Sequence, residues 1–325
     1  MLLGLDTSSY HLAAGLGDWQ PSQNPPMRLE HFFRKAAELG LQGVAISDLK
    51  LLERADYAYF SSLRRLADDD GLFLQLNYAG YRTDHLQDSI RVAGALGCKI
   101  ITFIPTLERP VSPQMMHARL DEISALLADA LPVAERYGVT LALGSKTLTM
   151  DELYHLFQTA DNERLSFSLD PTAALRVLED PLEWATELAP HVSSLQLSDF
   201  QIAPTPDGAK LNCCDFGAGI VDIAALVQTV LNEVPHAHLV LATPCETISL
   251  PFLDEVYLER LQQLRPVQLA HFFRLLRDRG LAAPPPLPYR ADMPEDEILA
   301  IEDDRFQASL DWLRGRFDAT VPDSD

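Results

Sequence analysis

Basic residues are scarce in this chain of 325 residues. Lys and Arg together number 26, against 47 Asp and Glu, so the formal net charge is −21 at pH 7. The net negative charge would repel a nucleic acid or another polyanion, because like charges repel. The composition therefore argues against a nucleic-acid partner.

Cysteine is scarce as well, and its spacing gives no metal-binding motif. The four residues are Cys98, Cys213, Cys214 and Cys245, and no CxxC pair occurs among them. Structural zinc sites usually contain such pairs, whereas a few isolated thiols fit a reducing compartment. The last three follow late strands and would lie near one rim, but adjacent cysteines point in different directions and no histidine accompanies them. We expect unreactive free thiols.

A targeting segment and a nucleotide-binding motif are also missing. The first apolar run starts at Leu2 and stops at Asp6, which is too short for a signal peptide or a membrane-spanning helix. We therefore expect a cytoplasmic protein without a membrane partner. A GxGxxG turn after an early strand, which a nicotinamide-binding domain would need, does not occur either.

What the chain does contain is an alternation of short apolar runs and amphipathic helical patterns. The helical pattern that begins at Leu29 stops at Gly40, and a later one stops at Gly138, as helices often do. The repeat length of roughly 34 residues matches a βα unit, so we predict an α/β fold, a (β/α)₈ TIM barrel. The predicted strands are LLGLDTS from Leu2, GVAISD from Gly43, LFLQLNY from Leu72, KIITFIP from Lys99, VTLALG from Val139, LSFSLD from Leu165, SSLQLSD from Ser193 and HLVLATP from His238.

The end of the chain falls outside this repeat. We predict that residues 1–252 form the barrel and residues 253–325 a C-terminal helical extension. The extension contains a helical stretch broken at Pro266, a proline-rich linker and a final amphipathic helix that begins near Pro294. Its apolar face must pack either on the barrel or on a partner subunit. A homo-oligomer and a heteromer with a homologue both remain open.

Three segments of the second half carry a family resemblance. They are SFSLDP, which contains Asp170, EDPLEWATELAPHVSSLQLSD and FGAGIVDIAALVQTVL. Together they resemble the xylose isomerase-like TIM barrels, the group of sugar and sugar-phosphate isomerases and epimerases. In that family the fifth strand usually ends in Glu-Asn-His, the sixth in Asp, the seventh carries His and the eighth ends in Glu. The Glu, Asp, His and Glu side chains hold one divalent cation over the barrel mouth.

Most of these ligands are replaced in this chain. Asp170 is retained, but the other positions fall on Gly144, Ser145 and Lys146, on Gln196 and on Ala242. The resemblance therefore implies a degraded site without a metal, because a hard cation needs several oxygen or imidazole ligands. A slip of a few residues in the eighth strand would bring Glu246 inward in place of Ala242. In that case a Mn, Mg or Co ion would be expected.

Lys146 and Asp170 are the predicted catalytic residues. The cation of the family places positive charge beside the oxygens of a hydroxy-carbonyl substrate. Lys146 lies two residues past the lost Glu, and its ammonium would supply this charge, or act as a base or Schiff-base nucleophile if desolvated. The alternatives are that Lys146 only pairs with Asp170 or points into solvent, and that Asp170 only caps the following helix.

Polar residues at other predicted strand ends are candidates for substrate binding. Structural roles or surface turns are the alternatives for each of them. The GAGI run from Gly217 would present backbone N–H groups to an anion, although a simple turn is the favoured interpretation. The substrate-binding candidates are Tyr10 and His11 after the first strand, Asp48 after the second, Asn77 after the third, and Gln196 and Asp199 at the seventh.

Two functions follow from these observations. The first is a sugar or sugar-acid isomerase or epimerase, or a related lyase or decarboxylase, in which Lys146 and Asp170 replace the metal. The C-terminal extension is similar to that of a sugar-acid branch of the family that includes oxo-isoapionate decarboxylases. The second is a non-catalytic binding or regulatory barrel paired with an active homologue. Either function implies a small carbohydrate or sugar acid as the ligand.

Overall fold

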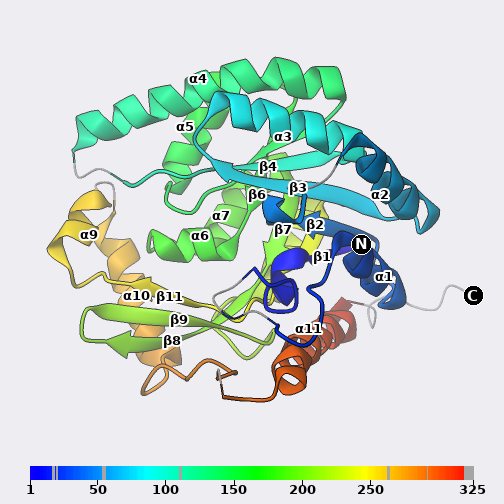
Figure 1. Ribbon diagram of the computed structural model, residues 1–325. Helices are drawn as coiled ribbons and strands as arrows, with labels where there is room; N and C mark the ends of the chain where they lie inside the picture. The colour runs from blue at the N-terminus through cyan, green and yellow to red at the C-terminus, as the bar shows by residue number, and fades with distance from the viewer. Residues whose placement is uncertain are drawn as a thin grey trace, which may run out of the picture.

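Eight parallel strands form a closed barrel surrounded by helices, as Figure 1 shows. The structure is a computed structural model that describes residues 1–16, 19, 21–52, 56–109, 112–261, 264–290 and 292–317. The predicted TIM barrel is confirmed, and each predicted strand is present. In order around the barrel, the strands are β1 (Leu2–Asp6), β10 (His238–Leu241), β7 (Val192–Leu197), β6 (Leu165–Leu169), β5 (Thr140–Leu143), β4 (Ile100–Pro105), β3 (Phe73–Gly80) and β2 (Gly43–Ile46).

The barrel closes between β1 and β10, the first and the last of its strands in the sequence. Leu3 pairs with Leu239 and Leu5 with Leu241 in this parallel ladder, and all four side chains are buried. Strands that are buried on both faces read as nearly continuous apolar runs. This is the reason why apolar runs alone located the barrel strands in the sequence.

Helices cover the outside of the barrel, and their ends follow local sequence signals. In α4, the Ser112 hydroxyl caps the amino end, and Gly138 ends the helix with φ = 66°, a left-handed conformation that suits glycine because it has no Cβ. In the described part of the chain, no helix is both long and apolar enough to cross a membrane. The helices are α1 (Leu29–Glu38), α2 (Tyr57–Asp69), α3 (Thr83–Leu96), α4 (Pro113–Tyr137), α5 (Met150–Ala160), α6 (Pro171–Arg176), α7 (Pro181–Leu188), α8 (Ile223–Glu233), α9 (Glu255–Arg260), α10 (Pro266–Arg279) and α11 (Glu295–Phe317).

A three-stranded antiparallel sheet follows β7, where the sequence led us to expect a loop. β8 (Asp199–Thr205) and β9 (Gly208–Cys214) form a hairpin, and β11 (Thr247–Leu250) pairs with β9. The hairpin turn contains Asp207 followed by Gly208, a pair that is typical of tight turns. The sheet lies beside α10 at the lower left of Figure 1.

The last helix, α11, packs on the chain's own barrel. Its Trp312 shares a surface depression with Ile223 of α8, and its Asp303 forms an ion pair with Lys35 of α1. The ring of the buried Phe306 lies 5.6 Å from the ring of Tyr10. Because α8 precedes β10 and α1 follows β1, α11 completes the ring of helices on the flank between these two strands. Figure 1 shows it beside α1.

Hydrogen bonds tie α11 to the first forty residues along its length. At its start, Glu295 accepts hydrogen bonds from the backbone N–H groups of residues 22–24. In its middle, the buried Glu302 accepts from the N–H groups of Leu12 and Ala13, each at 2.9 Å. Near its end, Arg314 donates to the carbonyl of Leu39 at 2.6 Å. The helix therefore spans the barrel from the loop after β1 to the end of α1.

Candidate active site

A cavity of about 210 Å³ opens at the carboxyl ends of the barrel strands. Every barrel strand contributes a lining residue, either from its last positions or from the loop that follows. This is the end at which TIM barrels build their active sites. The polar and charged lining residues are Ser8, Ser47, Asn77, Ser145, Lys146, Asp170, Thr172, Arg176, Gln196, Ser198 and Glu246.

Two cationic and two acidic side chains meet at this cavity. Lys146 follows β5, Arg176 ends α6, Asp170 follows β6 and Glu246 follows β10. Burial raises the pKa of Asp170, while the hydrogen bond from Thr172 and the charges of Arg176 and Lys146 oppose this shift. Desolvation against the cavity wall raises the pKa of Glu246 as well, although part of this residue is exposed at the rim; the charge of Arg176 opposes this shift and that of Asp170 adds to it. The cavity therefore places two carboxyl groups with raised pKa values beside two positively charged side chains.

Asp170 has a structural role in addition to its place at the cavity. Its Oδ1 accepts a hydrogen bond of 2.8 Å from the Thr172 N–H and so caps the amino end of α6. Asp170 therefore caps the helix, as the structural alternative predicted. This role is compatible with a catalytic one, because Asp170 also lines the cavity. Its catalytic role stays a prediction.

The four positions that hold a cation in the resembling family do not form a metal site here. A Cβ at Gly144 would lie 3.1 Å from Thr102 Cγ2 and 3.2 Å from Ile104 Cγ1, so a glutamate would be crowded at this point. Ala242 is buried and carries no ligand atom. Glu246 does reach the cavity, but among the described residues no group of three or more His, Cys, Asp or Glu is arranged to hold a metal ion. These residues do not fit the family's cation.

The floor of the cavity is a hydrogen-bonded chain of polar side chains. Ser47 donates to Asp6 at 2.6 Å, and Asn77 donates to Ser47 at 2.8 Å. Gln75 then links Asn77 to Thr102 by hydrogen bonds of 3.3 and 3.1 Å. Burial raises the pKa of Asp6, which ends β1. These hydrogen bonds fix the Asn77 amide and the Ser47 hydroxyl in place at the cavity surface.

The turn that presents Lys146 is fixed on both sides. The Ser145 hydroxyl accepts hydrogen bonds from the N–H groups of Thr147 and Leu148, at 3.0 and 2.6 Å. The Thr147 hydroxyl donates to the carbonyl of Leu107 at 3.4 Å. Serine favours such local turns because its hydroxyl can reach the backbone two or three residues ahead. Lys146 therefore leaves a well-defined turn at the cavity wall.

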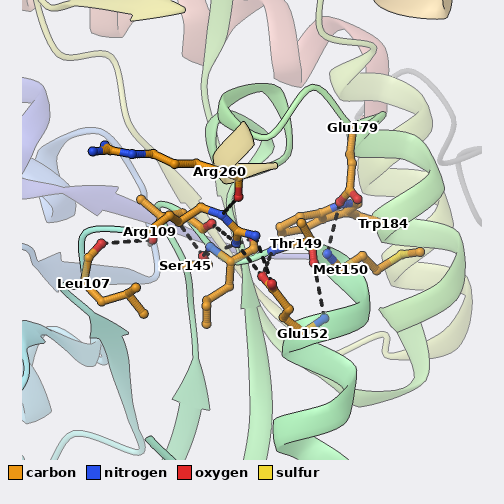
Figure 2. A network of polar contacts seen from close by, with 11 residues as sticks. Leu107, Arg109, Ser145, Thr149, Met150, Glu152, Glu179, Trp184 and Arg260 are labelled. Atoms are coloured by element: carbon orange, nitrogen blue, oxygen red, sulfur yellow. Dashed lines mark hydrogen bonds and ion pairs between the residues drawn. The ribbon is translucent and has the colours of Figure 1, made fainter. Parts of the chain in front are cut away.

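A buried ion pair supports this turn from behind, as Figure 2 shows. Arg109 donates to the Glu152 carboxylate of α5, with a bond of 2.9 Å to Oε1, and both side chains are almost fully buried. Arg109 also donates to the carbonyls of Thr147 at 2.7 Å and of Arg260 at 2.9 Å. The Glu152 carboxylate in turn accepts from the Thr149 N–H at 2.8 Å. One guanidinium thus connects the Lys146 turn, α5 and α9.

The structure brings four of the predicted site residues together and places the others elsewhere. Lys146, Asp170, Asn77 and Gln196 line the cavity, as does Glu246, which the sequence offered only as a replacement for Ala242. Arg176, Ser47 and Asp6 were missed. Asp6 ends a buried strand just as Asp170 follows one, so the same strand-end signal would have found it. Arg176 lies one helix further along the chain and carries no such signal.

Tyr10, His11 and Asp48 do not line the cavity. Tyr10 is buried, with its ring 6.2 Å from that of Phe32. His11 Nδ1 lies 3.2 Å from the Ser8 carbonyl oxygen, facing α11. Asp48 accepts a hydrogen bond from the Lys50 N–H in a local turn. In each case the structure shows packing or turn formation, because the chain bends away from the barrel axis directly after the strand.

Asp199 is also a structural residue. Its carboxylate is fully buried and accepts hydrogen bonds of 2.8–3.0 Å from the N–H groups of Phe200, Gly217, Gly219 and Val221. In the GAGI run, the N–H groups of Gly217 and Gly219 therefore donate to this carboxylate, and the other two donate to backbone carbonyl oxygens. This accounts for the turn and removes the reason to expect a bound anion there.

The cysteines are free thiols with raised pKa values. Cys98, Cys213 and Cys245 are buried, and Cys214 is half-buried. Burial raises the pKa of Cys98 to about 12 and that of Cys245 to about 11. A thiol with such a pKa is protonated near neutral pH and is therefore a poor nucleophile.

An eight-stranded α/β barrel with a polar, charged cavity at the carboxyl ends of its strands is the architecture of a small-molecule enzyme or binding protein. Within this class, the sequence model of the xylose isomerase-like TIM barrel matches residues 33–267. The chain belongs to this family.

Individual relatives support the assignment. The 3-oxo-isoapionate decarboxylase of Pectobacterium atrosepticum is 29% identical over 235 residues, which cover 71% of this chain and 81% of the relative. The solved structure of an L-ribulose 3-epimerase has a TM-score of 0.59 at 14% identity and covers 99% of both chains. A D-psicose 3-epimerase from Clostridium cellulolyticum, solved with D-tagatose, has a TM-score of 0.58 at 12% identity, over 85% of this chain and 99% of its own. The two epimerases share the fold.

Proposed function

We propose that this protein is a decarboxylase of 3-oxo sugar acids. The main support is that two positively charged side chains and two carboxyl groups line one cavity. They are Lys146, Arg176, Asp170 and Glu246. The similarity to a 3-oxo-isoapionate decarboxylase, over most of both chains, favours this reaction among those of a sugar isomerase and epimerase family. The proposed reaction replaces the family's divalent cation by side-chain charge.

The chemistry of such a reaction needs both kinds of group found here. When the bond between the carboxylate carbon and the α-carbon breaks, CO₂ leaves and the electron pair passes to the 3-oxo oxygen as an enolate. Lys146 and Arg176 would stabilise this negative charge, as fixed positive groups do for other enolates. A proton must then be added to the α-carbon to give the product ketone.

We assign the proton donor to Asp170. Its pKa is raised by burial, so it can hold a proton, and it is less exposed than Glu246 at the rim. Its Oδ1 is oriented by the Thr172 N–H, which fixes the direction of the carboxyl group. Glu246 would pass a proton from solvent back to Asp170 after each turnover, because it lies at the exposed rim of the same cavity.

The direct test is CO₂ release from 3-oxo sugar acids, measured with and without EDTA. We expect release that EDTA does not reduce, and a loss of about 10²–10³-fold in kcat for Lys146→Met, the range seen when one stabilising donor is removed. Lys50→Met, on an exposed lysine outside the cavity, is the control. Isomerisation or epimerisation of the substrate without CO₂ release would overturn the proposal, and so would activity that depends on an added divalent ion.

A further inference from the structure

A second cavity of about 300 Å³ lies next to the first. It is bounded by β9, by the segment after β10, by the proline-rich linker at Pro285 and Leu287, and by Arg305 of α11. Glu246 lines both cavities, so they share a wall. None of the sequence-predicted site residues except Glu246 belongs to this second cavity.

Arg305 lines this second cavity, and two of its side-chain nitrogens have no hydrogen-bond partner among the described residues. The residue is only 9% exposed, and one terminal nitrogen donates to Cys245 Sγ at 3.7 Å. Its Nε and its other terminal nitrogen have no hydrogen-bond partner in the described part of the protein. Asp215 forms an ion pair with Arg305, but its Oδ1 lies 3.6 Å from Nε, which is too long for a hydrogen bond.

Asn212 adds another unused donor to the same cavity. Its side chain is 7% exposed, and its Oδ1 accepts a hydrogen bond from the Thr247 hydroxyl at 2.9 Å. This contact fixes the amide orientation and leaves Nδ2 without a partner among the residues described. Buried donors without partners are destabilising, so their presence at one cavity indicates a ligand that satisfies them.

The pattern of unused atoms selects the chemistry of that ligand. Nε and the outer terminal nitrogen form the edge of the guanidinium that binds a carboxylate through two parallel hydrogen bonds. Asp215 and Glu246 also line the cavity, and Asp215 is 48% exposed. A ligand with further negative charge would be repelled by them, whereas hydroxyl groups would donate to them. A polyhydroxylated monocarboxylate satisfies both sides.

We propose that Arg305 and Asn212 bind the carboxylate of a sugar-acid substrate beside Glu246, where the two cavities adjoin, so that the oxo group two carbons away faces Lys146. This inference rests on the proposed function and names the substrate class of the same site. The carboxylate loses its charge as CO₂ forms, so its contact with Arg305 belongs to the bound substrate rather than to the transition state. Loss of Arg305 should therefore raise Kd and KM more than it lowers kcat.

The binding test uses L-threonate, which carries a carboxylate but no oxo group, beside the polyol threitol and inorganic phosphate. Isothermal titration at constant ionic strength should give at least tenfold tighter binding of threonate than of threitol. Arg305→Gln should abolish this preference, and Arg305→Lys should lose most of it, because lysine keeps the charge but not the fork. Arg277→Gln, which removes the same charge at an exposed site, should bind threonate as the wild type does.

Other results would overturn the inference. Equal binding of threonate and threitol, wild-type affinity in the folded Arg305→Lys variant, or Arg305-dependent binding of phosphate but not of threonate would each do so. Should Arg305→Gln fail to fold, Arg305→Lys and Asn212→Ser carry the test.

Lys146→Met separates the two proposals, because it should still bind threonate. If threonate binding depends on Arg305 but no 3-oxo sugar acid releases CO₂, only the proposed reaction is rejected. If CO₂ is released and Arg305→Lys has an unchanged KM, only the proposed carboxylate subsite is rejected.

Discussion

At the scale of single residues, the site depends on which side chains keep a charge at the barrel mouth. Lys146 and Arg176 face Asp170 and Glu246, and the raised pKa values of the two carboxyl groups arise mainly from burial. A family that relies on a bound cation takes the positive charge of its site from that ion. In this chain the positive charges belong to side chains, so their position depends on the turns that carry them.

The pH dependence of the reaction should report on Asp170. A proton donor acts in its protonated form, so activity should fall as the pH rises through the pKa of Asp170, which burial raises above its ordinary value. Asp170→Asn should lower kcat by about 10²–10⁴-fold and should remove this alkaline limb. Asp88→Asn, on an exposed residue of α3, should leave the pH–rate profile of CO₂ release unchanged. An identical limb in Asp170→Asn would assign the proton to another group.

At the scale of elements, the turn after β5 depends on a contact made far outside it. Arg109, from the segment before α4, donates to the carbonyl of Thr147 and also to Glu152 of α5 and to the carbonyl of Arg260 of α9. The sequence shows each of these residues as an ordinary charge. Their pairing follows from the way the loops meet at the carboxyl end of the barrel.

Removal of one partner of this ion pair should be costly. Arg109→Met leaves the Glu152 carboxylate buried without its partner, and we expect a loss of about 3–5 kcal/mol in the free energy of unfolding. The double variant Arg109→Met/Glu152→Met should lose less than Arg109→Met alone, because it leaves no buried charge. Urea unfolding of both proteins measures this difference. Glu108→Gln, at an exposed pair with Arg260, is the control and should change stability by less than about 1 kcal/mol.

The contact between α11 and the segment after β1 should make stability depend on pH. Burial raises the pKa of Glu302 to about 7, and Asp303 adds to the shift while the hydrogen bonds of Leu12 and Ala13 and the charge of Arg305 oppose it. The folded state then binds more protons than the unfolded state between pH 4.5 and 7. The stability that protonated Glu302 contributes is complete below pH 4.5 and is lost as the pH rises through 7.

Glu302→Gln removes the contribution of Glu302. His11 has the opposite effect on the pH dependence of stability, because burial lowers its pKa. The free energy of unfolding of the variant, relative to wild type, should increase between pH 5 and pH 8 by on the order of 2 kcal/mol. Glu297→Gln, on the exposed face of α11, should follow the wild type at both values. A constant difference between Glu302→Gln and wild type would contradict the expectation.

At the scale of the whole molecule, the sequence predicted the barrel well because its signals are local. Each barrel strand is a short apolar run, and Asp170 and Asn77 could be assigned to the mouth because parallel strands end on one side. The antiparallel sheet was missed because its strands β8 and β9 lie where a barrel would place a loop. Arg305 was missed because its approach to the cavity depends on how the distant helix α11 packs, and Arg176 was missed because it ends α6, beyond the strand-end signal of Asp170.

The position of α11 makes residues 295–317 part of the barrel's folding unit. A chain that ends at residue 290 would expose Tyr10 and would leave the flank between β10 and β1 without its helix. We expect it to aggregate or to lose cooperative thermal unfolding. A chain that ends at residue 317 keeps the whole of α11 and should melt as the full chain does. A cooperative transition at the wild-type Tm in the shorter chain would show that the barrel is complete without α11.

The same arrangement has a consequence for how the protein is made. The first strand and the last helix are neighbours in space but lie at opposite ends of the sequence. During synthesis, the surface around Tyr10 and Leu12 therefore has to wait until α11 has left the ribosome. Domains usually fold as units during translation, so this barrel should stay open, with apolar surface accessible to chaperones, until residues 295–317 have been translated.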